Sequence, residues 1–318
     1  MKAAVVSAFD VPPRYEDCPD PAPAGDGDMI VDVLAAGLHP RVRSQADGSH
    51  YTSTDELPLV PGIDGVGRGP DGQLRYFILP DTALGAMAER TVVDPRRSIV
   101  LPDGADPVAV AAAMNPAMSS WVALRQRAPF QAGQDVLVLG ATGNAGQLAV
   151  QIAKLFGANR IVAAGRDAGR LAGLTAAGAT ATVSLDGQAA GVAGELARAA
   201  ADVDVVIDYL WGEPTAAAMT AIVTERTDRG RPLTWIEIGS VAGPAAAIPS
   251  AALRAARLTI VGSGQGSVSA REYLAELPAL AETITAGSFD VAARAVPLAD
   301  VEQAWAATDE TQRLVLVP

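Results

Sequence analysis

Between residues 135 and 264 the chain alternates between short runs that are apolar throughout and longer segments with one apolar helical face. Such runs predict strands buried on both faces, and the segments between them predict helices, so that a parallel sheet covered by helices is expected. The expected strands are 135–139, 160–164, 179–185, 203–210, 234–240 and 257–264. The expected helices are 144–156, 167–177, 188–201 and 214–225.

The pattern differs on either side of this region. Residues 1–100 contain short apolar runs, such as 2–9 and 29–38, separated by turns rich in Pro and Gly, and they predict a β-rich domain. After residue 270, helices are expected at 270–287 and 298–309, followed by a strand at 313–318. The most apolar window, 107–124, contains two prolines and predicts a buried pair of helices rather than a membrane span.

Composition narrows the function. A chain of 318 residues, 49% of them hydrophobic, has enough material for two domains. The net charge of −12 argues against binding to nucleic acid, because phosphate contacts need a basic patch. The single cysteine, Cys18, excludes an intramolecular disulfide and suits a reducing cytoplasm. The apolar start breaks at Asp10, too early for a secretory signal, so a cytoplasmic protein without a membrane segment is expected.

Three glycines spaced three apart, Gly140, Gly143 and Gly146, lie between an expected strand and an expected helix. In a parallel α/β unit such a turn lets the backbone approach a pyrophosphate, which the amides and dipole of the helix N-terminus then stabilise. The alternative is a tight turn without a ligand, and the regular strand–helix–strand order argues against it. The candidate phosphate-binding residues are Gly140, Thr142, Gly143, Asn144, Ala145 and Gly146.

The end of the second strand predicts the choice of cofactor. NAD sites usually carry an acidic residue there for the ribose 2′-hydroxyl, whereas NADP sites lack it and supply Arg. Here Gly165 stands in that place, Arg166 follows, and Arg170 lies one helical turn later. The guanidinium group suits a phosphate dianion, and NADPH is therefore predicted. Asp167 could instead act as a helix N-cap, and Arg170 could be an ordinary surface residue.

With these residues in place, the whole chain resembles a zinc-independent medium-chain dehydrogenase/reductase of the quinone oxidoreductase group. The stretch VLVLGATGNAGQLAVQIAKLFGA is similar to the glycine turn of that family. AAGLHPRVRSQADGSHY resembles AAGxNPxDxxxRxGxY, LPLVPGIDGVG resembles LPxxPGxDxxG, GAMAER resembles GxxAEY, and VDVVIDYLWGE resembles xDVVxDxVGGE. The chain departs from these patterns at His39, where Asn is usual, and at Trp211, where Gly is usual; Asn115-Pro116 is closer to the enoyl reductase branch.

The resemblance implies an α/β fold with a GroES-like, β-rich catalytic domain and a doubly wound Rossmann cofactor domain. The catalytic domain would comprise 1–118 and 268–318, and the cofactor domain 119–267. The nicotinamide would lie between the domains, and strand 257–263 would pair across a homodimer. The further cofactor residues so implied are Ser119, Leu210, Gly239, Ser240, Gly262, Ser263 and Gln265.

The expected activity is NADPH-dependent reduction of an electrophilic small molecule: a quinone or an activated double bond of an enone, enal or enoyl thioester. Tyr51 is the first candidate for the proton or the oxyanion hydrogen bond, on its match to the tyrosine in RxGxY, and His39 is the second. The alternatives are an aromatic residue of the surface loop or pocket wall for Tyr51 and an ordinary packing role for His39. A metal site is not expected, because Cys18, His39 and His50 are not spaced as zinc ligands. The alternative is a structural or regulatory protein that binds NADPH without turnover.

Overall fold

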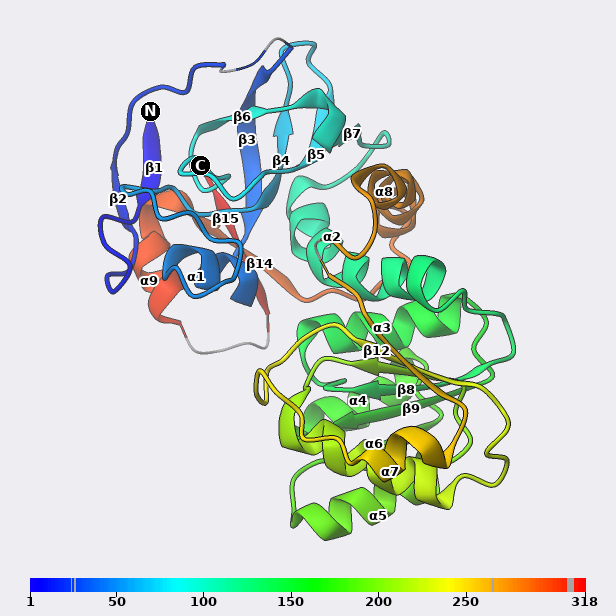
Figure 1. Cartoon of the computed structure of the whole chain (residues 1–318). Coiled ribbons are helices and arrows are strands. Elements are labelled where there is room, and N and C mark those ends of the chain that lie inside the picture. Colours follow the sequence, from blue (N-terminus) through cyan, green and yellow to red (C-terminus); the bar gives the residue numbers. More distant parts are fainter. Residues whose placement is uncertain (24, 26, 265, 308–311) are drawn as a thin grey trace. The chain divides into compact units, whose positions relative to one another are not determined.

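The computed structural model describes residues 1–23, 25, 27–264, 266–307 and 312–318 (Figure 1). The chain forms two compact units, one comprising Met1–Asn115 with Leu274–Pro318 and the other Pro116–Tyr273. The domain boundaries expected from the sequence, after residues 118 and 267, lie close to these. Each unit has its own sheet and its own core of buried apolar side chains.

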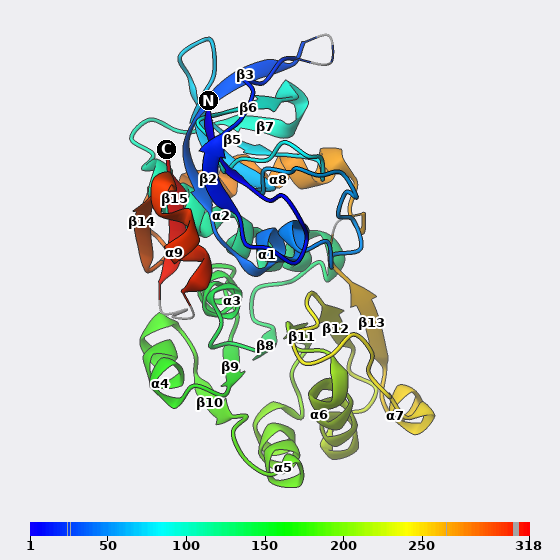
Figure 2. The ribbon, with the colours of Figure 1, turned by 90° about the vertical axis from the view of Figure 1, so that its left-hand side faces the viewer.

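The second unit contains a six-stranded parallel sheet in the order β10-β9-β8-β11-β12-β13, which can be followed from one side of Figure 2 to the other. Numbered along the chain from one to six, these strands run 3-2-1-4-5-6, the order of doubly wound dinucleotide-binding domains. The order reverses between β8 and β11, so that β9 and β11 flank β8 on opposite sides. The strands are β8 Asp135–Leu139, β9 Arg160–Gly165, β10 Ala181–Ser184, β11 Val205–Asp208, β12 Leu233–Glu237 and β13 Leu258–Gly262.

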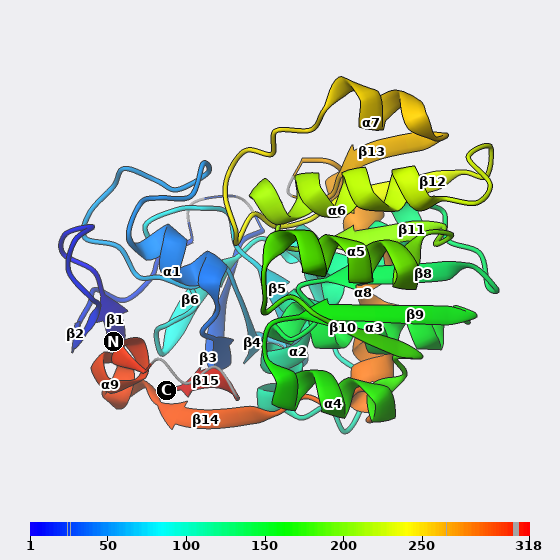
Figure 3. The same cartoon turned by 90° about the horizontal axis from the view of Figure 1, so that it is seen from below.

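Helices cover both faces of this sheet. Figure 1 shows α3 above the sheet and α5, α6 and α7 below it, and Figure 3 shows α5 and α6 side by side along one face. The apolar core beneath α5 and α6 joins buried residues of five strands to leucine, alanine, methionine and isoleucine side chains of these helices. The helices are α3 Asn144–Leu155, α4 Ala168–Ala177, α5 Ala189–Ala200, α6 Gly212–Glu225 and α7 Ser250–Ala255.

The first unit is built on a seven-stranded sheet in the order β14-β15-β3-β4-β5-β7, with β6 also paired to β3. All pairs are antiparallel except β14 with β15, and a separate antiparallel pair joins β1 and β2. The strands are β1 Lys2–Val5, β2 Arg14–Asp17, β3 Met29–Gly37, β4 Asp64–Arg68, β5 Leu74–Ile78, β6 Arg90–Val93, β7 Ser98–Val100, β14 Ala293–Pro297 and β15 Arg313–Val317. The helices are α1 Pro40–Ala46 and α9 Val301–Ala306. Two further helices continue from one unit into the other: α2 Pro107–Val122 begins in the first unit and α8 Ala270–Thr285 in the second.

The α/β architecture and all six parallel strands confirm the prediction from the apolar runs. The predicted helix pair at 107–124 is wrong: α2 is one helix that continues through Pro116 and then changes to a π-helical turn over Ala123–Arg127. Pro116 is tolerated inside α2 at the cost of one backbone hydrogen bond. By length and composition Pro107–Arg127 is the one candidate membrane span in the described part of the chain, and 72% of its apolar window is buried inside the fold, as in a core helix.

Candidate cofactor and proton-transfer sites

The turn after β8 brings the three spaced glycines to the point where the strand order reverses. Gly140 has a φ of 85°, which favours glycine, and its amide donates to the carbonyl of Ala164 at the end of β9. A Cβ at Gly146 would lie 2.6 Å from the Cα of Ala141, so only glycine lets α3 begin this close to the strand. Both positions therefore require glycine for the fold itself.

Gly143 is different. Its φ of −75° is open to any residue, and a Cβ there would meet only the Gly140 carbonyl, at an ordinary 3.6 Å. It is the N-cap of α3, so the amides of the first helical residues, Asn144, Ala145 and Gly146, have no acceptor inside the helix. The chain's own packing gives no reason for a glycine at 143, whereas a phosphate approaching these amides does.

The end of β9 lies against the same turn. A Cβ at Gly165 would come within 2.7 Å of the hydroxyl of Thr142, so any side chain at this position would require Thr142 to move. The guanidinium of Arg170 donates from Nη1 to the Thr142 carbonyl at 3.0 Å, which places this cation beside the glycine turn. Arg166 is exposed, and no partner for it is found among the described residues.

Asp167 is occupied by the helix that follows it. Its carboxylate accepts the amide of Arg170 at 3.0 Å as the N-cap of α4, and it lies 3.6 Å from the Arg170 guanidinium. The interpretation of Asp167 as an N-cap is therefore confirmed. A carboxylate held in this way is poorly placed to bind the hydroxyl groups of a ribose. The charged groups left at the end of β9 are therefore the cations of Arg166 and Arg170.

The buried carboxylate of Asp208 shapes the end of β11. It accepts the amides of Leu210 and Trp211 at 2.8 and 3.1 Å, the hydroxyl of Thr215 at 2.6 Å and the indole N–H of Trp235 at 2.8 Å. These four bonds satisfy the carboxylate and fix the loop after β11. Nothing in the apolar pattern of 203–210 predicted this role for Asp208.

Trp211 occupies a strained conformation within this loop. Its φ of 51° and ψ of −161° lie in a region almost restricted to glycine, which explains why glycine is usual at this place in the family pattern. Leu210 lies directly over the turn, because a Cβ at Gly140 would be 3.2 Å from its Cδ2. Gly239, at the end of β12, closes against the same loop through its amide, which donates to the Asp208 carbonyl at 3.2 Å.

The remaining predicted cofactor residues are spread over two further places. Ser119 on α2 lies 2.9 Å from the hydroxyl of Tyr209, so it does reach the end of β11. Burial raises the pKa of Tyr209 to about 12, although its bond to Ser119 opposes this shift. Ser240 is exposed after β12, whereas Gly262 and Ser263 lie at the end of the edge strand β13. Gln265 lies outside the described residues.

In the other unit, His39 is closed off from solvent. It is 3% exposed, its Nε2 lies 3.1 Å from Asp64, and the Tyr76 hydroxyl donates to the second oxygen of the same carboxylate at 2.8 Å. Burial lowers the pKa of His39, and the hydrogen bond to Asp64 offsets only part of this effect. The arrangement favours the packing role for His39 over proton transfer.

Tyr51 has the opposite environment. It is 77% exposed in the loop after α1, and its ring lies 4.3 Å from the ring of His50. In the pattern RxGxY the tyrosine follows the glycine by two residues, a spacing that falls on His50 rather than on Tyr51 when Gly48 is matched. The exposure of the phenol is therefore a better argument for a role of Tyr51 in the reaction than its match to the sequence pattern.

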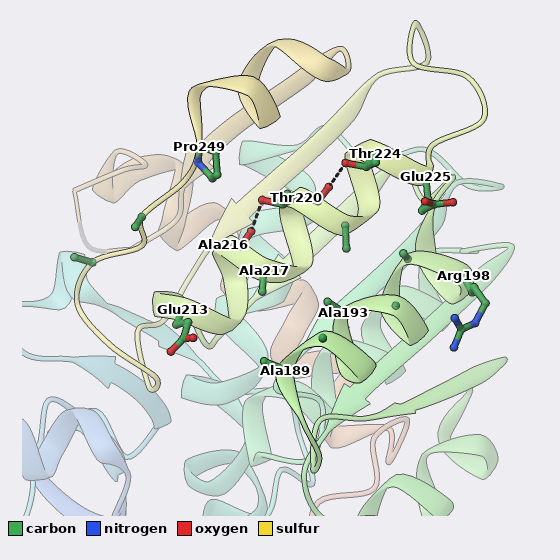
Figure 4. A pocket seen from close by; sticks show the side chains of 16 residues that line it. Ala189, Ala193, Arg198, Glu213, Ala216, Ala217, Thr220, Thr224, Glu225 and Pro249 are labelled. Atoms are coloured by element: carbon green, nitrogen blue, oxygen red, sulfur yellow. Dashed lines mark hydrogen bonds between the residues drawn. The ribbon is translucent and has the colours of Figure 1, made fainter.

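A large cavity of the second unit lies elsewhere. It has a volume of about 940 Å³ and lies between α5, α6 and the segment that ends at Pro249 (Figure 4). Its walls are mostly alanine, with Arg198, Glu213 and Glu225 at its margins. No convergent polar groups are seen among these lining residues, so the cavity does not compete with the glycine turn as a cofactor site. Among the residues that the structure describes, no group of three or more His, Cys, Asp or Glu could hold a metal ion.

No family model matches the sequence. The whole chain nevertheless aligns with the probable NADPH-dependent quinone reductase tdiC of Emericella nidulans, at 30% identity over an alignment of 360 positions that spans 100% of both chains. The chain belongs to the quinone oxidoreductase family of medium-chain dehydrogenases/reductases. The resemblance inferred from the motifs is thereby confirmed.

Two further comparisons place this quinone oxidoreductase family member. The quinone oxidoreductase of Thermus thermophilus, solved alone and with NADPH, is 25% identical, with a TM-score of 0.78 over 100% of both chains. The chloroplastic NADPH-dependent alkenal/one oxidoreductase of Arabidopsis thaliana is 29% identical over 152 residues, which are 42% of this chain and 39% of that protein. The first comparison extends over both units, and the second over less than half of the chain.

Proposed function

We propose that this chain is an NADPH-dependent reductase that works without zinc and transfers hydride to a quinone or to an activated double bond in an enone, enal or enoyl thioester. The observation that carries the proposal is the turn after β8. At this turn the packing of the chain does not require glycine at position 143, and the first amides of α3 have no acceptor inside the helix. The guanidinium of Arg170 lies beside the turn, and β9 ends in Gly165 rather than in an acidic residue. Full-length similarity to a quinone reductase supports the same activity.

The residues present fit NADPH. The amides of Asn144, Ala145 and Gly146 would bind the pyrophosphate, and Arg166 with Arg170 would pair with the 2′-phosphate. Leu210 and Gly239 line the adjoining strand ends, and Ser119 is held there by Tyr209. When bound, NADPH supplies the hydride. The chain's own contribution is then to hold the acceptor, stabilise the oxyanion and deliver a proton, and the exposed phenol of Tyr51 is suited to donate a hydrogen bond to that oxyanion.

Depletion of NADPH at 340 nm with a panel of quinones, enones, enals and enoyl thioesters tests the proposal. We expect oxidation of NADPH with at least one class of acceptor. Tight binding of NADPH without oxidation by any acceptor would overturn the reductase and favour a structural or regulatory binding protein instead. Elemental analysis of the purified protein should find no stoichiometric zinc, and chelators should leave the activity intact; one zinc per chain would contradict this part.

We further propose a homodimer formed by edge-to-edge pairing of strand 257–263. The strand β13 is the edge of the six-stranded sheet, and Ile260 on it is a large apolar residue that is 36% exposed. An uncovered apolar edge of this kind invites pairing with a second copy. Sedimentation should give a dimer at micromolar concentration, and a monomer throughout that range would refute the pairing. A cytoplasmic location is proposed on the single, unpaired cysteine, Cys18.

A further inference from the structure

Trp211 is a large aromatic residue at a place where the backbone favours glycine. Its φ of 51° and ψ of −161° can be adopted freely by glycine and only at an energetic cost by other residues. Among the described residues it is the one residue other than glycine with a positive φ, and Gly212 follows it with a φ of 69°. Strain of this kind persists where the side chain has a use, so the use of this indole is the question that the loop raises.

The bonds that hold the loop do not involve the indole. The Asp208 carboxylate accepts the amides of Leu210 and Trp211, and the amide of Ala242, after β12, donates to the Leu210 carbonyl at 2.8 Å. All of these bonds would also form with glycine at position 211. The half-buried indole makes no hydrogen bond and no ring contact with any residue that the structure describes. Hydrogen bonding and ring packing within the chain therefore give no reason for a tryptophan here.

The loop of Trp211 and the glycine turn belong to the same unit, and β8 lies between β9 and β11 in its sheet. The side chain of Leu210, which precedes Trp211, lies against Gly140 in the turn. A dinucleotide with its pyrophosphate at this turn and its 2′-phosphate at Arg166 and Arg170 extends its adenosine over β9. Because the pyrophosphate is in the middle of the molecule, the other half extends over β11 and β12, on the opposite side of β8 (Figure 2).

The dimensions of the sheet agree with a contact between Trp211 and that half. Neighbouring strands lie about 4.8 Å apart, so the ends of β11 and β12 lie within about 10 Å of β8. Trp211 is the third residue after Asp208, with which β11 ends, and it stands in the loop that the second half of the dinucleotide must cross. An aromatic side chain without a partner in the chain is suited to pack against a flat ring.

We propose that the indole of Trp211 packs against the nicotinamide ring of the bound cofactor and so adds affinity for that half of the molecule alone. This inference rests on the proposed function, which supplies NADPH as the cofactor. The strained backbone at position 211 is retained for this contact. The adenosine and pyrophosphate gain nothing from it, because they lie at β9 and at the turn. Removal of the indole should therefore weaken NADPH and leave unchanged the binding of 2′-phospho-ADP-ribose, which is the same molecule without its nicotinamide ring.

Isothermal titration of the full chain with these two ligands tests the contact without turnover. Trp211→Gly, which relieves the backbone, should bind NADPH about tenfold more weakly and 2′-phospho-ADP-ribose as the wild type does. Trp211→Phe keeps an aromatic ring and should retain most of the NADPH affinity. Leu155→Ala is the control, because Leu155 is an exposed apolar residue at the end of α3 away from the glycine turn, and it should change neither affinity.

Unchanged NADPH affinity in Trp211→Gly would overturn the proposal. An equal loss for both ligands, or a variant that fails to fold, would also overturn it, because the indole would then support the loop rather than the nicotinamide. A wild type that binds neither ligand would refute the proposed function and this inference with it. A wild type that binds NADPH but reduces no acceptor would refute the reductase alone, and the two affinities would still decide the role of Trp211.

NADP⁺ provides a readout of direct contact. Its oxidised nicotinamide is electron-poor and quenches an indole that touches it, and unlike NADPH it does not absorb the indole emission. The chain has four tryptophans, so the emission of Trp211 is obtained as the difference between the wild type and Trp211→Phe. Saturating NADP⁺ should quench this difference emission, whereas 2′-phospho-ADP-ribose should not. A difference emission that NADP⁺ leaves unquenched would rule out the contact.

Discussion

The hydroxyl of Tyr209 lies 2.9 Å from Oγ of Ser119, and Ser119 in turn donates to the carbonyl of Pro116 at 2.7 Å. This pair joins the loop after β11 to α2 inside the second unit. The phenol is buried, and burial raises its pKa from 10.0 to about 12. Because the buried phenol must remain neutral in the folded protein, this unit should lose stability at alkaline pH.

This link predicts how Tyr209→Phe behaves. Because the folded pKa is the higher one, the unfolded chain releases the proton first, so stability is intact below pH 10 and is lost as the pH rises toward 12. Two pKa units correspond to roughly 2–3 kcal/mol. Urea unfolding at pH 8 and pH 11.5 should therefore show a larger loss for the wild type than for Tyr209→Phe. Equal losses would mean that Tyr209 ionises freely in the folded protein.

Gly143 and Gly146 form a matched pair that separates cofactor binding from folding. Gly143→Ala should leave the melting temperature unchanged, because its Cβ meets nothing closer than 3.6 Å, but should weaken NADPH binding more than tenfold by filling the phosphate cradle. Gly146→Ala places a Cβ 2.6 Å from a backbone carbon and should cost about 1–3 kcal/mol of stability. Calorimetry and fluorescence titration measure the two effects. If Gly143→Ala binds NADPH as tightly as the wild type does, the phosphate does not bind at this turn.

The parts of the fold that the sequence predicts are those in which one local pattern suffices. The strands β8, β9 and β11 are apolar except for one charged residue at an end of each, and their positions follow from this pattern. The short strand β4 was not predicted, because its sequence DGVGR has two glycines and little apolar character. It exists because β3 and β5 pair with it on either side, which is information that a local pattern does not contain.

The same limit applies to the candidate sites. The glycine turn depends on spacing within seven residues and was visible in the sequence, as was the missing acid at Gly165. The role of Asp208 at the end of β11 was not, because one of its four donors is Trp235, 27 positions further along the chain, which only the fold brings beside it. Trp211 was recognisable as a departure from the family pattern, but its left-handed backbone conformation required the structure.

Arg166 and Arg170 predict the cofactor preference. NADPH should bind more tightly than NADH by about 1–3 kcal/mol, the range for charge-assisted hydrogen bonds. Arg166→Ala should remove most of this gap and leave NADH binding unchanged, because Arg166 is exposed and holds no other described residue. Arg170→Ala should weaken both cofactors, because it also frees the Thr142 carbonyl.

Isothermal titration with both cofactors distinguishes these effects. Arg160→Ala is the control, since Arg160 begins β9 at the end of the strand away from the turn. Equal affinity of the wild type for NADPH and NADH would contradict the assignment of the 2′-phosphate to these arginines.

At position 211 we expect the glycine variant to be more stable than the alanine variant, which is the reverse of the usual order. Alanine keeps the strained φ of 51°, whereas glycine adopts it freely, so Trp211→Gly should be more stable than Trp211→Ala by about 1–3 kcal/mol. At Glu213, an exposed residue in the first turn of α6, the alanine variant should be the more stable one by about 0.5–1 kcal/mol. Urea unfolding of the four variants provides the comparison. If alanine is favoured at both positions, the backbone at 211 is not strained.

Tyr51→Phe tests whether the phenol acts in the reaction or only contacts the acceptor. A phenol that donates a hydrogen bond to the developing oxyanion contributes in the transition state, so its loss should lower kcat about 10²-fold with the KM for NADPH intact. An unchanged kcat with a raised KM for the acceptor would instead make Tyr51, which is 77% exposed, a contact surface for the acceptor.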